Sequence, residues 1–239
     1  MKQVLAISLF ILACSLIGFG QTESRADLLK QMETKRADLA RIEQQFLAPA
    51  AEDLSAYSEF LAQPGTGLIR LLPREKFDPA IMKTSPITIR GGGAYYSFSR
   101  LTHEYGYGSD IELANNVLSV GFAGADYGML AKIDGVQLDD VSAELPAVSF
   151  LAQYKPAPDE PAARVEQRRF STGTVVDGVS YKRQAPIEVG ATYVVRSISY
   201  GDGDVLAALK VVRQDTDGSL IIAWKLLNKF AKPQLARAQ

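Results

Sequence analysis

The spacing of apolar and polar residues divides this 239-residue chain into segments of different character. Residues 4–20 are uncharged and mostly apolar, and they follow the positive charge of Lys2. Gly18 and Gly20 close this run, and a polar stretch begins at Gln21. A charged start, an apolar run and small residues at its end are typical of a secretory signal peptide. We therefore predict a signal peptide over residues 1–20 and an exported protein, either periplasmic or extracellular.

Two alternatives for this segment stay open. Cys14, the only cysteine, follows Ile11-Leu12-Ala13, which faintly resembles a lipidation motif. The apolar run is also just long enough to cross a bilayer, so an uncleaved segment would anchor the protein, with the following helix as a stalk. A membrane is expected as a partner only if the signal is uncleaved or Cys14 is lipidated. Cleavage removes Cys14 and leaves no disulfide.

Helical spacing marks residues 21–63 as an N-terminal helical segment. Ser24 can cap a helix over 24–47, with Asp27 three residues later as a weaker capping box. Pro49 ends this helix, and a second one is predicted over 50–62. We expect the first helix to pack on its own domain, because one apolar stripe runs along it through Leu28, Met32, Leu39, Ile42 and Phe46.

From about residue 64 the apolar runs become short, β-branched and aromatic, which is typical of strands. This pattern predicts a β-rich domain over 64–145. Four prolines with several alanines predict an extended linker over 146–163. In the domain predicted over 164–239, a hairpin (165–176 and 179–184) precedes strands over 191–200, 204–213 and 219–227.

The last two strands are apolar at nearly every position, so they should be covered on both faces or curl into a small barrel. The predicted fold is therefore α+β, with two N-terminal helices, a β-rich middle domain and a C-terminal antiparallel meander or small β-barrel.

The net charge of −1 gives no basic face for nucleic acid, so nucleic acid is not expected as a partner.

The segment 90–110 has the most unusual composition. It holds the only histidine, four of the ten tyrosines and five of the nineteen glycines. Consecutive glycines have a high conformational entropy in the unfolded chain, which suggests a sharp turn or a close approach of the backbone to a ligand. Tyrosine offers an apolar face and a polar tip, which suits a carbohydrate or protein ligand. The candidate ligand-binding residues are Tyr95, Tyr96, Tyr105, Tyr107 and Gly92. The alternative is a glycine bulge in a sheet with ordinary strand tyrosines.

His103 is the weak candidate for catalysis, because Glu104, Asp110 and several serines lie near it in sequence. No nucleophile-elbow pattern surrounds it, and one histidine cannot build a histidine-rich metal centre. No cofactor or metal is expected. We therefore expect an exported non-catalytic binding or envelope-associated protein with 90–110 as its ligand surface. The alternatives are an exported hydrolase with His103 as general base, and a membrane-anchored protein with a helical stalk.

Overall fold

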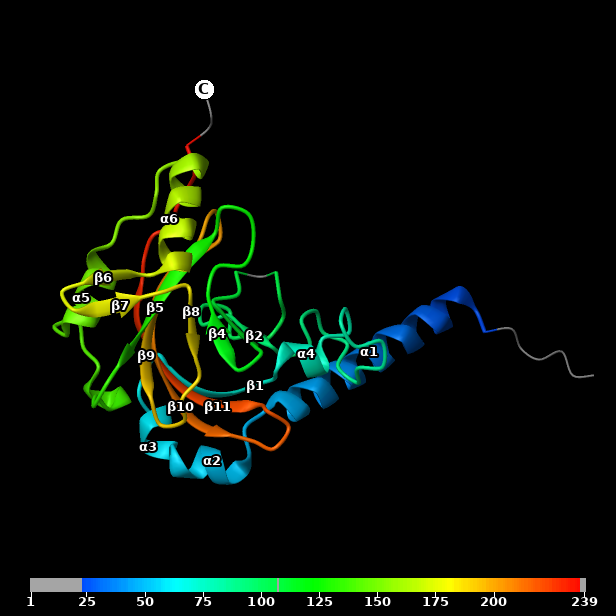
Figure 1. Ribbon diagram of the computed structural model, residues 1–239. Coiled ribbons are helices and arrows are strands. Elements are labelled where there is room, and N and C mark those ends of the chain that lie inside the picture. Colours follow the sequence, from blue (N-terminus) through cyan, green and yellow to red (C-terminus); the bar gives the residue numbers. More distant parts are fainter. Residues whose placement is uncertain (1–22, 107, 237–239) are drawn as a thin grey trace, which may run out of the picture. The chain divides into compact units, whose positions relative to one another are not determined.

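The computed structural model describes residues 23–106 and 108–236. The predicted signal peptide, Cys14 and Tyr107 lie outside the described residues. The chain divides into two units, Met1–Ile42 and Glu43–Gln239. Helix and strand occur in nearly equal shares, 29% and 30%, which confirms the mixed α+β class (Figure 1). The helices are α1 (Arg25–Leu47), α2 (Ala51–Ala56), α3 (Ser58–Leu61), α4 (Arg74–Phe77), α5 (Pro146–Gln153) and α6 (Glu160–Thr172), with a 3-10 turn η1 (Leu138–Asp140).

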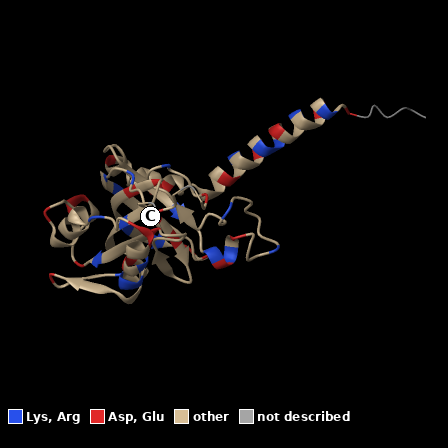
Figure 2. Ribbon diagram, turned by 90° about the horizontal axis from the view of Figure 1, so that it is seen from above, with Lys and Arg blue, Asp and Glu red and all other residues tan. Residues whose placement is uncertain are grey.

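The start of α1 confirms the predicted cap. The Ser24 hydroxyl accepts the backbone N–H of Asp27 at 3.1 Å and donates to the Asp27 carboxylate at 2.7 Å. This reciprocal contact satisfies one of the free N–H groups at the helix start. Figure 2 shows acidic and basic residues interspersed along α1. Among the described helices, none combines the length and apolar content that crossing a bilayer requires.

Five antiparallel strands form the main sheet, in the order β1-β11-β10-β9-β5. The predicted meander β9-β10-β11 is confirmed and occupies the centre of this sheet. The two outer strands come from earlier in the chain, so the middle and C-terminal segments share one sheet. The strands are β1 (Thr66–Leu71), β5 (Tyr127–Ile133), β9 (Thr192–Ser199), β10 (Gly203–Gln214) and β11 (Leu220–Lys229).

Both faces of the main sheet are buried. Ala208 and Ala223 face a core shared with α5 and α6, whereas Leu209 and Ile222 face a core shared with the second sheet. This double burial explains why the central strands are apolar at nearly every position. The described strands do not close into a barrel, so the barrel alternative is wrong and the two-sided alternative is correct.

The second sheet has the strand order β2-β3-β4-β8 and carries part of segment 90–110. Its strands are short: β2 (Tyr95–Tyr96), β3 (Ile111–Ala114), β4 (Val117–Ser119) and β8 (Gln184–Pro186). Residues 86–90, within the region predicted to be β-rich, form no strand. A separate hairpin joins β6 (Thr174–Val176) to β7 (Val179–Tyr181) through Asp177 and Gly178, both at positive φ, as predicted.

The structure differs from the expected linker over 146–163 and from the strand predicted over 165–176, because α5 and α6 occupy most of the first region and α6 continues to Thr172 in the second. Pro146 is the first residue of α5, and Pro161 lies in the first turn of α6. A proline in the first turn removes only an N–H that the helix leaves unpaired. Asp159 caps α6 by accepting the N–H of Ala162 at 2.8 Å. The prolines therefore start helices here.

A buried ion pair joins the main sheet to α5. Arg196 on β9 and Asp204 on β10 are each 1% exposed. Arg196 donates from Nε and Nη2 to the two carboxylate oxygens of Asp204 at 2.9 and 2.8 Å. Its Nη1 donates to the carbonyls of Leu151 and Tyr154 at the end of α5. The charge is thus matched by acceptors on two elements, as a buried guanidinium requires.

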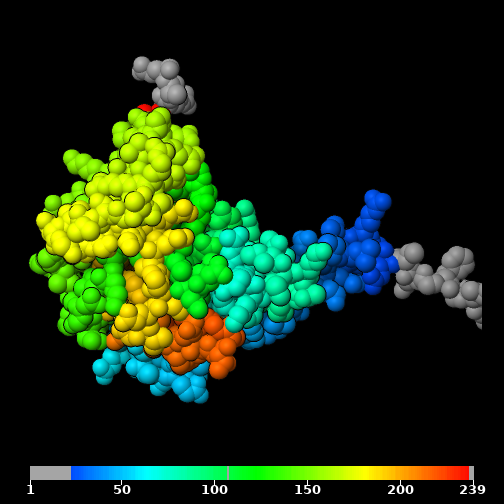
Figure 3. Space-filling model, in the orientation of Figure 1, coloured from blue at the N-terminus to red at the C-terminus, as the bar shows by residue number. Residues whose placement is uncertain are grey.

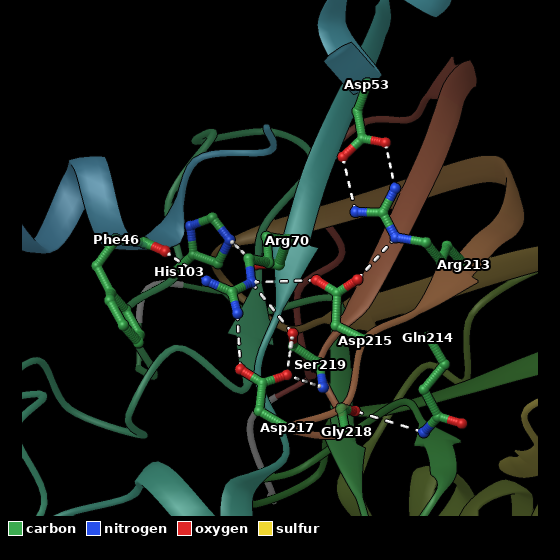
Figure 4. Close-up of polar contacts among 10 residues, drawn as sticks. All are labelled: Phe46, Asp53, Arg70, His103, Arg213, Gln214, Asp215, Asp217, Gly218 and Ser219. Atoms are coloured by element: carbon green, nitrogen blue, oxygen red, sulfur yellow. Dashed lines mark hydrogen bonds and ion pairs between the residues drawn. The ribbon is translucent and has the colours of Figure 1, made fainter. Parts of the chain in front are cut away.

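Helix α2 lies beside the β10–β11 turn, where the space-filling view shows cyan atoms next to orange ones (Figure 3). Arg213 of β10 forms a bidentate ion pair with Asp53 of α2. Its Nη1 contacts Oδ1, and its Nη2 lies 2.9 Å from Oδ2. Arg213 also donates to Asp215 at 2.7 Å. Arg70 on β1 continues the network, with 2.6 Å to Asp217 (Figure 4). These contacts tie the helical segment from α2 onward to the sheet.

Candidate ligand-binding site

The three consecutive glycines of segment 90–110 form a tight turn. Gly91, Gly92 and Gly93 all have positive φ, at 85°, 59° and 77°. A Cβ atom on Gly92 would lie 2.2 Å from the carbonyl oxygen of Phe77, which ends α4. Any side chain at this position would therefore collide with backbone. The turn holds the chain against α4 and places the next residues at the edge of the second sheet.

A cavity of about 430 Å³ opens beside this turn. Its volume lies in the range of small-molecule sites in proteins. The walls come from α4 and the loop after it, β2, β3 and the segments after β4 and before β8. The lining residues are Arg74, Asp78, Ala80, Arg90, Gly91, Tyr95, Tyr105, Glu112, Phe122 and Arg183.

Three aromatic rings form the apolar part of the cavity. The centroid of the Tyr95 ring lies 4.7 Å from that of Tyr105 and 5.3 Å from that of Phe122. Tyr95 is buried, and its hydroxyl donates to Oε1 of Glu112 at 2.6 Å. Burial and this hydrogen bond raise the pKa of Tyr95 above its usual range. Tyr95 therefore forms the fixed floor, while the less buried Tyr105 and Phe122 present their surfaces to the cavity.

Three guanidinium groups and two carboxylates make up the charged part. Arg74 bridges both acids, since Nε lies 3.1 Å from Oδ2 of Asp78 and Nη1 lies 3.1 Å from Oε1 of Glu112. Arg90 lies over the Tyr105 ring, 4.5 Å from its centroid. Arg183 donates from Nε to the carbonyl of Val120 at 3.2 Å.

The structure separates the candidate residues of segment 90–110. Tyr95 and Tyr105 meet in the cavity, together with Gly91. Gly92 packs against the end of α4 and does not line the cavity. Tyr96 lies in the core between the two sheets, 5.5 Å from the Phe98 ring and 6.1 Å from the Trp224 ring. The place of Tyr107 is not described.

His103 lies away from the cavity, partly buried against Tyr96, with ring centroids 5.0 Å apart. Its Nε2 donates to the backbone carbonyl of Arg70 at 3.0 Å (Figure 4). Burial lowers the pKa of His103 to about 4, so the ring is neutral near pH 7. Within the described part of the chain, no carboxylate or hydroxyl group hydrogen-bonds to this imidazole. The arrangement provides neither an activated nucleophile nor an acid that orients the ring.

Asp110, the other acid near His103 in sequence, is buried in the same region. Its Oδ2 accepts the backbone N–H of Phe98 at 2.7 Å. Burial raises the pKa of Asp110 to about 7, against hydrogen bonds from Ser197, Phe98 and Ser97 that favour the charged form. In the described residues, no group of three or more acidic, histidine or cysteine side chains is placed to hold a metal ion.

Sequence reasoning missed Arg74, Glu112, Phe122 and Arg183, because they come from separate elements and carry no shared motif. Arg90 opens the segment, but nothing in its neighbours marks it as a ligand contact. Comparison with protein families, curated proteins and solved structures finds no match to this chain. The assignment of function therefore depends on the geometry of the cavity.

Proposed function

We propose that this chain is an exported, non-catalytic binding protein that holds a small ligand in the cavity beside Tyr95 and Tyr105. The observation that carries the proposal is the convergence of aromatic rings and guanidinium groups from five separate parts of the chain on one hollow of about 430 Å³. Apolar surface with a few converging polar groups is what small-molecule sites have in common. The N-terminal pattern of residues 1–20 supports a periplasmic or extracellular location.

Tyr105 is the residue through which binding is best tested. It lines the cavity, is only partly buried and donates no hydrogen bond from its side chain among the described residues, so its ring can contact a ligand. Tyr105→Phe keeps the ring, and Tyr105→Leu removes it. Ligand-observed NMR with a panel of monosaccharides, oligosaccharides and short peptides would identify a binder. Calorimetry would then compare its affinity for the two variants.

We expect Tyr105→Phe to bind within about threefold of the parent protein and Tyr105→Leu to bind about tenfold more weakly, a difference of about 1.4 kcal/mol. Equal unfolding midpoints of the two variants would show that the fold is intact. Binding that is unchanged in Tyr105→Leu would place the ligand elsewhere and contradict the proposal. Intact-mass measurement of the exported protein tests the location, since a mass beginning at Gln21 eliminates the membrane anchor.

A further inference from the structure

Among the residues that the structure describes, two of the three guanidinium groups in the cavity have no acidic partner. Within the described residues, neither Arg90 nor Arg183 forms an ion pair. Arg90 is exposed and lies over the face of Tyr105, and Arg183 uses a single N–H on a backbone carbonyl. Each guanidinium has five N–H donors, so most of the donors of Arg90 and Arg183 are available to a group of the ligand.

The charge balance of the cavity limits what that group can be. Arg74, Arg90 and Arg183 carry three positive charges, and Asp78 and Glu112 carry two negative ones. Arg74 contacts both acids but offsets only one of their two negative charges, so the five groups together carry one excess positive charge. A ligand with a single negative charge is neutralised there, and Arg is the side chain that best matches a carboxylate.

Glu112 supplies a second selective contact. Its Oε1 accepts hydrogen bonds from Tyr95 and Arg74, which fix the side chain. Its Oε2 receives no hydrogen bond from the described residues. This oxygen is not fully buried, because the fully buried side-chain atoms that lack a partner do not include it. This oxygen is therefore open to the cavity. An ionised carboxylate can only accept, so it fits a hydroxyl group of the ligand.

We infer that the ligand is a hydroxylated ring carrying one carboxylate, as in a uronic acid. Its carboxylate lies on Arg90 and Arg183, its ring lies beside Tyr105, and a hydroxyl donates to Oε2 of Glu112. This inference rests on the proposed function and narrows the ligand to one chemical class. The cavity volume accommodates one or two sugar rings, since small-molecule sites of this size enclose ligands of that scale.

The test is calorimetry of the full mature chain with four probes: D-glucuronate, D-glucose, D-glucose 6-phosphate and cyclohexanecarboxylate. The first two differ only at C6, and the last keeps the ring and carboxylate but has no hydroxyl. We expect D-glucuronate to bind at least tenfold more tightly than each of the others. Arg90→Gln should weaken D-glucuronate about tenfold and change D-glucose less than twofold. Arg168→Gln, on the exposed side of α6, is the matched control and should change neither.

Each of the other possible binding results overturns one part of this inference. Equal binding of D-glucose and D-glucuronate overturns the charge selection, and tighter binding of D-glucose 6-phosphate assigns the arginines to phosphate instead. Equal binding of cyclohexanecarboxylate overturns the role of Glu112. In each of these cases the proposed function stands, because a ligand still occupies the cavity. Failure of every probe here and of the wider panel overturns both proposals together.

Discussion

Replacing Gly92 by alanine tests whether this glycine, which does not line the cavity, determines the position of the α4 residues that do. Two costs add at this position. The positive φ of 59° is unfavourable for any residue with a Cβ, by about 1–2 kcal/mol. The new Cβ would lie 2.2 Å from the Phe77 carbonyl oxygen and 2.5 Å from the Asp78 nitrogen, both backbone atoms.

Real Cβ contacts do not fall below 3.0 Å, so the end of α4 must shift by about 0.8 Å to admit the methyl group. Overpacking of this kind costs about 1–3 kcal/mol. We therefore expect Gly92→Ala to lose about 2–5 kcal/mol of the free energy of unfolding. The shift also moves Asp78, which orients Arg74, so affinity for a cavity ligand should fall although Gly92 does not touch the cavity.

Gly135 provides the matched control. Its φ of 73° is equally positive, but no heavy atom lies within 4 Å of the position that a Cβ atom would take there. Gly135→Ala therefore carries the backbone cost alone, about 1–2 kcal/mol. Urea unfolding followed by fluorescence of Trp224, the only tryptophan and 4% exposed, measures both variants. If the two free energies of unfolding differ by less than about 0.5 kcal/mol, the steric argument for Gly92 is wrong.

Three further predictions use the same unfolding assay. Asp204→Asn leaves the guanidinium of Arg196 buried without its counter-charge and should cost about 3–5 kcal/mol, whereas Glu160→Gln in an exposed pair on α6 should cost less than about 1 kcal/mol; similar losses would contradict the account of burial. The folded-state pKa of His103, about 4, lies below the ordinary 6.5, so the unfolded chain binds the extra proton and the contribution of His103 to stability falls as pH drops from 6.5 to 4. His103→Gln should remove that slope, and an unchanged slope would refute its assignment. The folded-state pKa of Asp110, about 7, lies above 3.8, so the contribution of Asp110 to stability falls as pH rises between these values. The two contributions have opposite signs between pH 4 and 6.5, so each is measured as the difference between the variant and the parent protein. Asp110→Asn should remove the Asp110 contribution, and an unchanged pH profile would count against the buried carboxyl.

Local patterns predicted the elements whose formation depends on neighbours in sequence. Ser24 and Asp27 form the expected cap, and the turns at Asp177-Gly178 and around Asp215–Ser219 connect strands as their residues favour. The error at Pro146 and Pro161 has a local cause as well, since proline at a helix start resembles proline in a linker.

The cavity depends on contacts that no local pattern contains. Tyr95 and Tyr96 are neighbours in one short strand, so their side chains point to opposite faces, one to the cavity and one to the core. Composition alone could not separate them. Glu112 lies opposite Tyr95 in the register of β2 and β3, which only the strand pairing reveals. Arg183 comes from a segment far from Glu112 in sequence, just before β8.

The strand order of the main sheet has a consequence for how the protein is made. β1 and β5 lie at the two edges, and their hydrogen-bonding partners β11 and β9 are the last and third-last strands of the chain. β5 cannot pair until β9 (Thr192–Ser199) has been synthesised, and β1 cannot pair until β11 (Leu220–Lys229) has been synthesised; such long-range pairing is slow. If residues 1–20 act as the predicted signal peptide, a chain threaded outward behind them could not complete this sheet until β11, close to the C-terminus, has been delivered. Under that prediction, the topology would delay the main sheet until translocation of the chain is nearly complete.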